Sequence, residues 1–393
     1  MNNNILNTVI QKFISENISA DITSILLQNH HFEEVSIKEV VEQIEAKKKC
    51  KLKLPTWYKT PNIYYSNKLN IEQTSSEITA KYKSEIISGN SIIDLTGGFG
   101  VDCYYFSQAF NNVTHCELNK ELSEIANHNF QVLKVANIKA VSANGISYLN
   151  QQNVNYDWIF IDPSRRNDIK GKVFYLNDCL PNVPEHLDKF FNYTDNILVK
   201  TSPMLDISHG ISELRYVKNI HIVAVNNEVK EVLFVLARDY SAGIEIKTVN
   251  FQKEKNQEFI FLHAEESAAI VNNEEVKNYL YEPNAAILKA GAFKSVAQSL
   301  RVSKLHQHSH LYTSDSMIDF PGRSFIVEKI IPYNKRKIKP LLEKQKINAS
   351  TRNFPESVAQ LKKKFKFRDG GDDYVFFTTN YKSEKVAIFC KKA

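Results

Sequence analysis

The sequence has few cysteines and no long hydrophobic run, and each absence excludes a class of protein. Its 393 residues include five cysteines, which are scattered and form no CxxC pair, so neither a disulfide framework nor a zinc cluster is predicted. No stretch approaches the ~18 apolar residues needed to cross a bilayer. The first residues lack the basic and apolar regions of a signal peptide. We therefore expect a cytoplasmic protein with no membrane segment and no bound metal.

The remaining composition is typical of a globular protein with more than one domain. Hydrophobic residues make up 43% of the chain and charged residues 24%, which excludes a disordered protein. Positive charge is concentrated near the C-terminal end, where residues 323–393 hold 18 lysines and arginines against 7 acidic residues. The whole chain has a net charge of only +6. A separate basic unit indicates a polyanionic partner.

The pattern of apolar positions predicts an α/β protein with four parts. Residues 1–70 read as a small helical unit and a linker, because apolar positions recur at helical spacing before a stretch of lysines, prolines and aromatic residues. Residues 71–240 are predicted to form a Rossmann-like domain. Two smaller α+β parts follow, a connecting unit at 241–322 and the basic unit at 323–393.

In the Rossmann-like part, helices alternate with short apolar runs, which is the spacing of a parallel sheet with crossover helices. The last two runs, 220–225 and 229–237, are too close for a helical crossover and should form an antiparallel hairpin at the end of the sheet. The five predicted parallel strands are residues 91–95, 113–116, 138–141, 158–161 and 197–199.

The C-terminal parts are predicted to mix helices and strands. A long helix is expected at 284–300, and the basic unit should contain two helices, near 335–346 and 355–365. The strands predicted for the basic unit are 325–331, 374–379 and 386–390.

The linker at 47–70 combines lysines with aromatic residues and allows two interpretations. It is either a solvated connector packed by its aromatic rings, or a surface on which cations and stacking rings hold a nucleic-acid strand. The aromatic residues concerned are Trp57, Tyr58, Tyr64 and Tyr65.

A glycine-rich turn follows the first predicted strand, between Asp94 and Asp102. Its glycines let the backbone turn tightly and approach a ligand closely, while the amides of the next helix face whatever binds. Glu117 ends the next strand, 23 residues after Asp94, near the ~20-residue offset at which a carboxylate reaches ribose hydroxyls. The pattern therefore predicts an adenosine-containing cofactor.

The glycine pattern indicates which cofactor this is. A dinucleotide fingerprint needs Gly-x-Gly-x-x-Gly, but Cys103 stands at the third glycine, and no phosphate loop ending in Gly-Lys-Ser/Thr is present at this turn. The turn instead resembles the cofactor site of class I S-adenosylmethionine methyltransferases, with Thr96 in place of the first glycine and Gly97 as an extra one. This resemblance implies cofactor contacts for Asp94, Thr96, Gly97, Gly98, Gly100, Asp102 and Glu117.

The fourth strand ends in a second motif, which begins at Asp162. It resembles the Asp-Pro-Pro-aromatic motif of amino-group methyltransferases that act on nucleic acids, in which the acid and a neighbouring carbonyl hold the target amine. An Asp-Pro turn without function is the alternative. No cysteine at the end of the fifth strand could supply the thiolate needed for methylation of a pyrimidine carbon, which leaves direct transfer to nitrogen. The predicted catalytic residues are Asp162, Pro163, Ser164 and Arg165; Asp162 is also expected to contact the cofactor, and Arg166 the substrate.

The basic unit contains two groups of cations that either form a phosphate-binding surface or are simply solvated helix ends. We expect the first. The residues predicted to bind substrate are Lys335, Arg336, Lys337, Arg352, Lys362, Lys363 and Lys364.

The motifs taken together resemble the bacterial family of THUMP-like-domain-containing class I methyltransferases. The matching stretches lie at 71–76, 94–102, 162–166, 202–206, 281–284, 289–291 and 312–315. The resemblance implies a Rossmann-like catalytic domain, a small ferredoxin-like unit and a THUMP-like tail similar to RNA-binding modules of tRNA modification enzymes. It also implies that the cofactor contacts include Gln73, Ser75 and Asn144.

The function expected from these observations is methyl transfer from S-adenosylmethionine to a base nitrogen of structured RNA, either tRNA or rRNA. Two alternatives remain open at this point. The chain could methylate a protein or a small molecule, or it could be a catalytically silent RNA-binding protein that keeps the cofactor fold.

Overall fold

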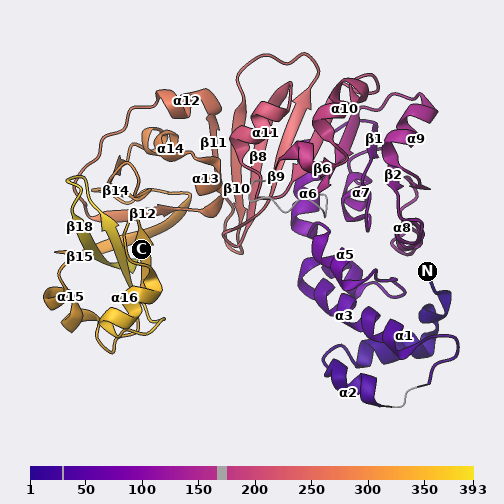
Figure 1. Cartoon of the computed structure of the whole chain (residues 1–393), viewed down its shortest axis with the longest axis horizontal. Coiled ribbons are helices and arrows are strands. Elements are labelled where there is room, and N and C mark those ends of the chain that lie inside the picture. The colour runs from indigo at the N-terminus through magenta and orange to yellow at the C-terminus, as the bar shows by residue number, and fades with distance from the viewer. Residues whose placement is uncertain (29–30, 166–174) are drawn as a thin grey trace. The chain divides into compact units, whose positions relative to one another are not determined.

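The computed structural model describes residues 1–28, 31–165 and 175–393. These residues form two compact units (Figure 1). The first contains Met1–Val217 and Phe234–Tyr240, and the second contains Lys218–Leu233 and Ser241–Ala393. No helix within the described ranges is long and apolar enough to cross a membrane.

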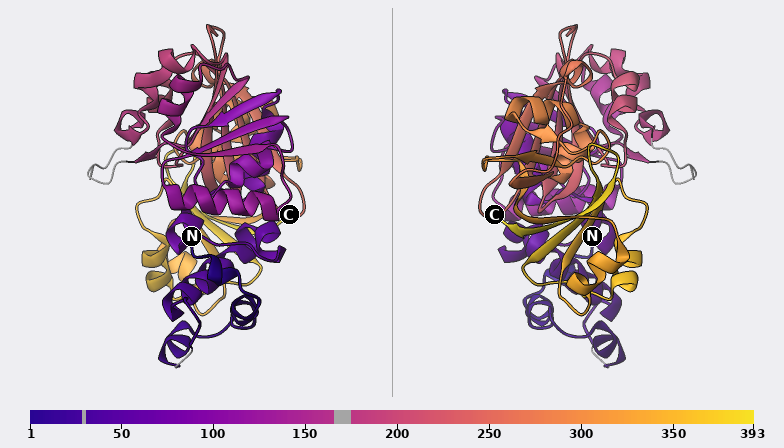
Figure 2. Two further views of the ribbon diagram at one scale, coloured as in Figure 1. Left: turned by 90° about the vertical axis from the view of Figure 1, so that its right-hand side faces the viewer. Right: turned by 90° about the vertical axis from the view of Figure 1, so that its left-hand side faces the viewer.

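The first unit begins with a group of helices, coloured indigo to violet and lying beneath the strands of this unit in Figures 1 and 2. The longest, α3, starts at a capping box in which Ser36 and Glu39 bond each other's backbone amides. The elements are η1 (Asn3–Leu6), α1 (Thr8–Glu16), α2 (Ile22–Leu27), α3 (Ile37–Lys53), α4 (Pro55–Lys59) and α5 (Lys68–Gln73).

The aromatic side chains of the linker lie in the core of this helical region. Trp57, Tyr64 and Tyr65 are 1%, 6% and 3% exposed. The same hydrophobic core contains Phe99 and Val101, which belong to the glycine-rich turn and the helix after it. These three rings are therefore packed inside the protein, as the first interpretation expected, and their stacking on a nucleic-acid strand is wrong. The prediction of a solvated connector was also wrong, because most of this region lies in α3, α4 and α5.

A sheet of parallel strands forms the rest of the first unit. Strand β1 pairs with β2 on one side and β4 on the other, β2 pairs with β3, and β4 with β7, all in parallel. The elements are α6 (Glu77–Ile86), β1 (Ser91–Asp94), α7 (Val101–Phe106), β2 (Asn112–Glu117), α8 (Lys120–Val132), β3 (Ile138–Ser142), α9 (Gly145–Gln152), β4 (Trp158–Ile161), β5 (Ser164–Arg165), η2 (Leu176–Asp178), β6 (Cys179–Leu180), α10 (Val183–Phe190), β7 (Asn196–Thr201) and α11 (Ile207–Glu213).

The five predicted parallel strands are thus confirmed, in the order β7, β4, β1, β2, β3. Parallel neighbours end at the same edge of a sheet. The carboxyl ends of β1, β2, β4 and β7 therefore bring the glycine-rich turn and the Asp162 motif to one edge, where α/β proteins bind ligands.

The predicted hairpin is also present, formed by the neighbouring strands β8 (Val217–Val225) and β9 (Glu228–Ala237). Asn226 and Asn227 join them with φ angles of 51° and 64°, the left-handed region that a tight two-residue hairpin requires. The division between the two compact units passes through these two strands.

The second unit continues with a strand pair and a seven-stranded sheet. Strand β10 pairs in parallel with β8 and antiparallel with β11. The seven strands have the order β13, β14, β12, β15, β18, β17, β16, and Figure 1 shows α15 and α16 beside this sheet. The elements are β10 (Glu245–Phe251), β11 (Gln257–Leu262), α12 (His263–Ala268), β12 (Tyr279–Pro283), α13 (Ala285–Ala290), α14 (Phe293–Leu300), β13 (Ser303–Lys304), β14 (Tyr312–Ser314), β15 (Gly322–Pro332), α15 (Lys335–Leu342), β16 (Asn348–Arg352), α16 (Val358–Phe365), β17 (Asp373–Thr379) and β18 (Lys385–Lys392).

One prediction for this unit was wrong, and one strand of the basic unit was missed. The single helix expected at 284–300 is two helices, because Gly291 adopts a φ of 71° and ends α13. Strand β16 was not predicted, since its sequence, NASTR, lacks the apolar residues that mark a strand. It forms at the edge of the sheet by parallel pairing with β17.

Candidate active site and cationic surface

The glycine-rich turn lies directly against the neighbouring strand and helix. Gly100 has a φ of 85°, and a Cβ atom there would lie 2.5 Å from the ring of Phe130. A Cβ atom at Gly97 would lie 2.3 Å from the ring of His115. Larger residues at these two positions would push the turn away from β2 and α8, so the glycines are required by its close packing.

Glu117, at the end of β2, holds the turn in place. Its Oε2 accepts a hydrogen bond of 2.9 Å from the amide of Gly98, and its Oε1 accepts one of 2.7 Å from the amide of Asn119. The carboxylate is partly exposed. Because a carboxylate offers about four acceptor positions, two remain for a ligand. The glycine turn and Glu117, which were predicted to lie together, are therefore in direct contact.

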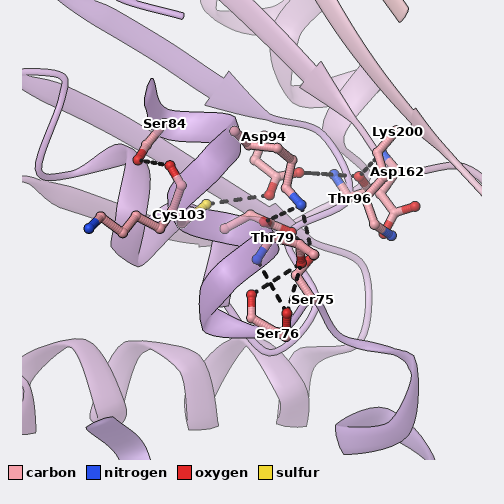
Figure 3. A network of polar contacts seen from close by, with 12 residues as sticks. Ser75, Ser76, Thr79, Ser84, Asp94, Thr96, Cys103, Asp162 and Lys200 are labelled. Carbon is pink, nitrogen blue, oxygen red and sulfur yellow. Dashed lines mark hydrogen bonds and ion pairs between the residues drawn. The ribbon is translucent and has the colours of Figure 1, made fainter. Parts of the chain in front are cut away.

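Asp94 lies beneath the turn and is 1% exposed. Its Oδ1 accepts hydrogen bonds from the amide and the hydroxyl of Thr96, at 2.8 and 3.2 Å, and its Oδ2 accepts one from Cys103 Sγ at 3.4 Å (Figure 3). Burial raises the pKa of Asp94 to about 8, with a smaller contribution from the nearby Asp102 carboxylate. Asp94 therefore shapes the turn through Thr96, and its burial favours the protonated carboxyl group.

Asp102, in the first turn of α7, joins the turn to the chain that enters α6. Ser75 Oγ donates to Asp102 Oδ2 at 2.8 Å, and Lys83 Nζ lies 3.1 Å from Asp102 Oδ1. The Lys83 side chain is fully buried, and its ammonium also bonds Ser75 Oγ at 3.2 Å. Two residues that the resemblance assigned to the cofactor, Ser75 and Asp102, are thus in direct contact.

Gln73 and Asn144, which the resemblance also assigned to the cofactor site, are exposed and lie at helix ends. Gln73 is the last residue of α5, two residues before Ser75. Asn144 caps α9 and accepts a hydrogen bond of 3.0 Å from the amide of Ser147. The neighbouring Gly145 is close to the glycine turn, since a Cβ atom there would lie 2.5 Å from the carbonyl oxygen of Leu95.

Asp162 follows β4 at the same edge of the sheet. Its backbone amide donates to Thr96 Oγ1 at 2.7 Å, so one hydroxyl connects the ends of β1 and β4. Its Oδ2 lies 2.5 Å from the ammonium of Lys200, at the end of β7 (Figure 3). The sequence interpretation missed Lys200. This contact follows from the order of the strands in the sheet, which makes the ends of β4 and β7 neighbours.

The structure describes residues 163–165 of the Asp162 motif. Pro163 is buried and Ser164 is exposed, and β5 pairs antiparallel with β6 through the pairs Ser164 with Leu180 and Arg165 with Cys179. Arg166 lies outside the described residues. In the described ranges no group of three or more histidine, cysteine, aspartate and glutamate side chains could hold a metal ion.

The cations of the basic unit fall into two classes. Lys335, Arg336 and Lys337 in α15 and Lys363 in α16 are exposed, and none of them makes an ion pair within the described part of the chain. Lys362 pairs with Asp369, and Lys364 lies 2.9 Å from Glu356. The first class is available to phosphates, whereas the second is partly neutralised.

Arg352 is paired with a buried carboxylate. It lies 2.7 Å from the carboxylate of Glu282, which Arg323 binds from the other side. Glu282 is only 3% exposed. The sequence grouped Arg352 with the substrate-binding cations, but this contact gives it a structural role that no local pattern indicates.

Comparisons with known proteins find matches to the two C-terminal domains and to nearly the whole chain. Family models of a ferredoxin-like domain and of a THUMP domain-like module match residues 279–321 and 322–392. A crystal structure of a "putative methyltransferase" from Porphyromonas gingivalis W83 is 31% identical, covers 98% of both chains and superposes with a TM-score of 0.88.

A curated relative from Mycoplasma mobile, named as an uncharacterized RNA methyltransferase, is 25% identical over 201 residues. The match covers 47% of this chain and 55% of that protein, so the chain spans about half the length of this relative. The near-complete match to the Porphyromonas gingivalis protein covers the parallel sheet as well as both C-terminal domains. The chain therefore belongs to the methyltransferase family that combines a Rossmann-like domain with ferredoxin-like and THUMP-like domains.

Proposed function

We propose that this protein transfers a methyl group from S-adenosylmethionine to a base nitrogen of structured RNA, either tRNA or rRNA. The observation that carries the proposal is the meeting of three strand ends at one edge of the sheet. The glycine turn after β1, Glu117 at the end of β2 and Asp162 after β4 are linked there by hydrogen bonds through Gly98 and Thr96.

The residues around the turn fit an adenosine-containing methyl donor. Glu117 is held by two backbone amides and keeps acceptor positions for the two ribose hydroxyls. Asp94 and Thr96 shape the turn itself, while the Ser75 and Asp102 pair fixes the chain that enters α6. The remaining proposed contacts are Gln73, Gly97, Gly98, Gly100 and Asn144. The bound donor would supply an electrophilic methyl group.

Asp162 is proposed to hold the nucleophile. A nitrogen that attacks a methyl carbon must aim its lone pair at that carbon while its hydrogen is held by an acceptor, and positioning of this kind supplies much of the rate. The Asp162 carboxylate and the Pro163 carbonyl are the acceptors proposed for this role. Ser164 and Arg165, the next two residues in the chain, are proposed to complete the catalytic motif. The extended Asp162 motif has no aromatic ring to stack on a base, so the base must be held by contacts other than this motif.

RNA is proposed as the substrate because a separate unit carries the positive charge. The exposed cations of α15 and α16 belong to the part that matches a THUMP domain-like model. Clustered cations bind phosphates by releasing counterions, which favours a polyanion. The name of the Mycoplasma mobile relative supports the same substrate class. A small-molecule methyltransferase would not need this unit.

The proposal is tested by mass spectrometry of nucleosides from tRNA and rRNA of cells with and without the gene. We expect one methylated nucleoside to disappear in the deletion strain and to return when the purified protein and labelled S-adenosylmethionine are added to that RNA. Label in a protein or metabolite fraction instead of RNA would identify a different substrate class. Binding of both the donor and RNA, without label in any fraction, would favour a catalytically silent RNA-binding protein.

A further inference from the structure

Lys200 occupies a position that the proposed chemistry does not yet explain. It is the fifth residue of β7, whose parallel pairing with β4 sets Val199 opposite Ile161. The next residues along the two strands, Lys200 and Asp162, therefore extend side by side from the carboxyl edge of the sheet. Lys200 is 13% exposed at its side chain, and an ammonium buried to this degree needs compensating contacts.

The two oxygens of Asp162 differ in their surroundings. Oδ2 lies 2.5 Å from Lys200 Nζ, whereas Oδ1 accepts no hydrogen bond from any residue in the described ranges. The side chain is 32% exposed. Its backbone is fixed separately, because the Asp162 amide donates to Thr96 Oγ1. Asp162 is thus anchored at two points, its backbone amide and Oδ2, while Oδ1 keeps its acceptor positions.

We propose that Lys200 is a positioning residue that holds Asp162 so that Oδ1 accepts the hydrogen of the nitrogen to be methylated. This inference rests on the proposed function and narrows its substrate class to nitrogens that carry hydrogen, either an exocyclic amine or a ring N–H. A ring nitrogen with only a lone pair has no hydrogen to give to Oδ1, so the arrangement disfavours it.

The nitrogen lone pair forms the bond to the methyl carbon while the carbon–sulfur bond breaks, and its electron pair stays on sulfur as a neutral thioether. The hydrogen of the nitrogen passes as a proton to Asp162 Oδ1 and then to solvent. The Lys200 ammonium keeps its own protons throughout, and its contact with Oδ2 limits rotation of the carboxylate during the transfer.

The test is a double-mutant cycle in the full-length protein, with single-turnover methyl transfer to the RNA that the wild type labels. Lys200→Met and Asp162→Asn should each lower the rate by about 100-fold, and the double variant should be no more than about threefold slower than either one. Rate losses that multiply in the double variant would show that Lys200 acts independently of Asp162 and would overturn the proposal.

Three further measurements separate positioning from a structural role. Affinity for S-adenosylmethionine by calorimetry, affinity for RNA and melting temperature should all stay close to wild type in Lys200→Met, and Lys200→Arg should recover at least a tenth of the wild-type rate. The matched control is Lys247→Met, which removes another partly buried lysine paired with a carboxylate, Glu258, at 2.8 Å. It should keep the wild-type rate.

The labelled nucleoside decides the substrate class. Label on a nitrogen that carried hydrogen supports the inference. Label on a lone-pair nitrogen contradicts it, together with the proposed role of Asp162 as hydrogen acceptor, and leaves only methyl transfer to RNA intact. A wild-type protein that labels no RNA would contradict the proposed function, and in that case the positioning role falls with it.

Discussion

The hydroxyl oxygen of Thr96 accepts a hydrogen bond of 2.7 Å from the backbone amide of Asp162. The same hydroxyl donates to the buried Asp94. Thr96 stands where the related cofactor turns have their first glycine, and a glycine could make neither bond. The departure from the usual pattern therefore has a structural consequence, because it ties the cofactor turn to the proposed catalytic motif.

Thr96→Val should slow methyl transfer by about 10- to 100-fold, since it keeps the shape of the side chain but leaves the Asp162 amide without its acceptor. Thr96→Ser should stay within about threefold of wild type because it keeps the hydroxyl. Single-turnover rates, measured together with melting temperatures, check this. Equal rates for the valine and serine variants would show that the bond between the strand ends is not needed.

Glu117→Ala should weaken S-adenosylmethionine binding by about 1.5 to 3 kcal/mol, the cost of losing charge-assisted hydrogen bonds. Titration calorimetry measures the affinity directly. Glu85→Ala, which removes an exposed carboxylate of α6, is the control and should bind as wild type does. Unchanged affinity in a folded Glu117→Ala protein would remove this residue from the cofactor site.

Asp94 predicts a pH dependence of stability. Its pKa is raised to about 8 in the folded protein, so between about pH 4 and pH 8 the folded state keeps a proton that the unfolded state has released. The free energy of unfolding should fall as the pH rises through this range, by at most about 5.5 kcal/mol from this residue. Urea unfolding of wild type and Asp94→Asn at several pH values tests it, and the variant should show a flatter dependence. Asp188→Asn, at an exposed position, is the control.

Glu282→Ala should lower the free energy of unfolding of the second unit by about 1 to 3 kcal/mol, because it leaves Arg323 and Arg352 without their shared carboxylate. The loss stays below that of a fully buried pair because both arginine side chains are partly exposed. Chemical unfolding followed by fluorescence measures it. A stability within error of wild type would show that solvent replaces the carboxylate without cost.

Removing the three exposed cations Lys335, Arg336 and Lys337 together should reduce the slope of log RNA affinity against log salt concentration by about 2 to 3. An equal change of charge outside the basic unit, at Lys120, Lys134 and Lys253, should have a smaller effect. Fluorescence anisotropy with labelled RNA at several salt concentrations gives both slopes. If the two triple variants behave alike, the surface of α15 does not contact phosphates.

Contacts within one motif, or between residues at a known separation along the chain, could be predicted from the sequence. The glycine turn and Glu117 could be paired because adjacent parallel strands place a carboxylate about 20 residues after such a turn. The ion pair between Lys200 and Asp162 could not be predicted, since it depends on which strands become neighbours. The contact of Arg352 with Glu282 joins residues 70 apart in the chain, and a cluster of cations gives no sign of which members are already paired.

Phe99, between Gly98 and Gly100, is 3% exposed and shares a hydrophobic core with Ile10 and Trp57 of the N-terminal helices. The turn is thus held from behind by helices that precede it in the chain. Any ligand that binds only when the turn is ordered will add its binding free energy to the stability of those helices, including α1, which contains none of the proposed contacts. Protease resistance of the N-terminal helices should therefore report occupancy of the site.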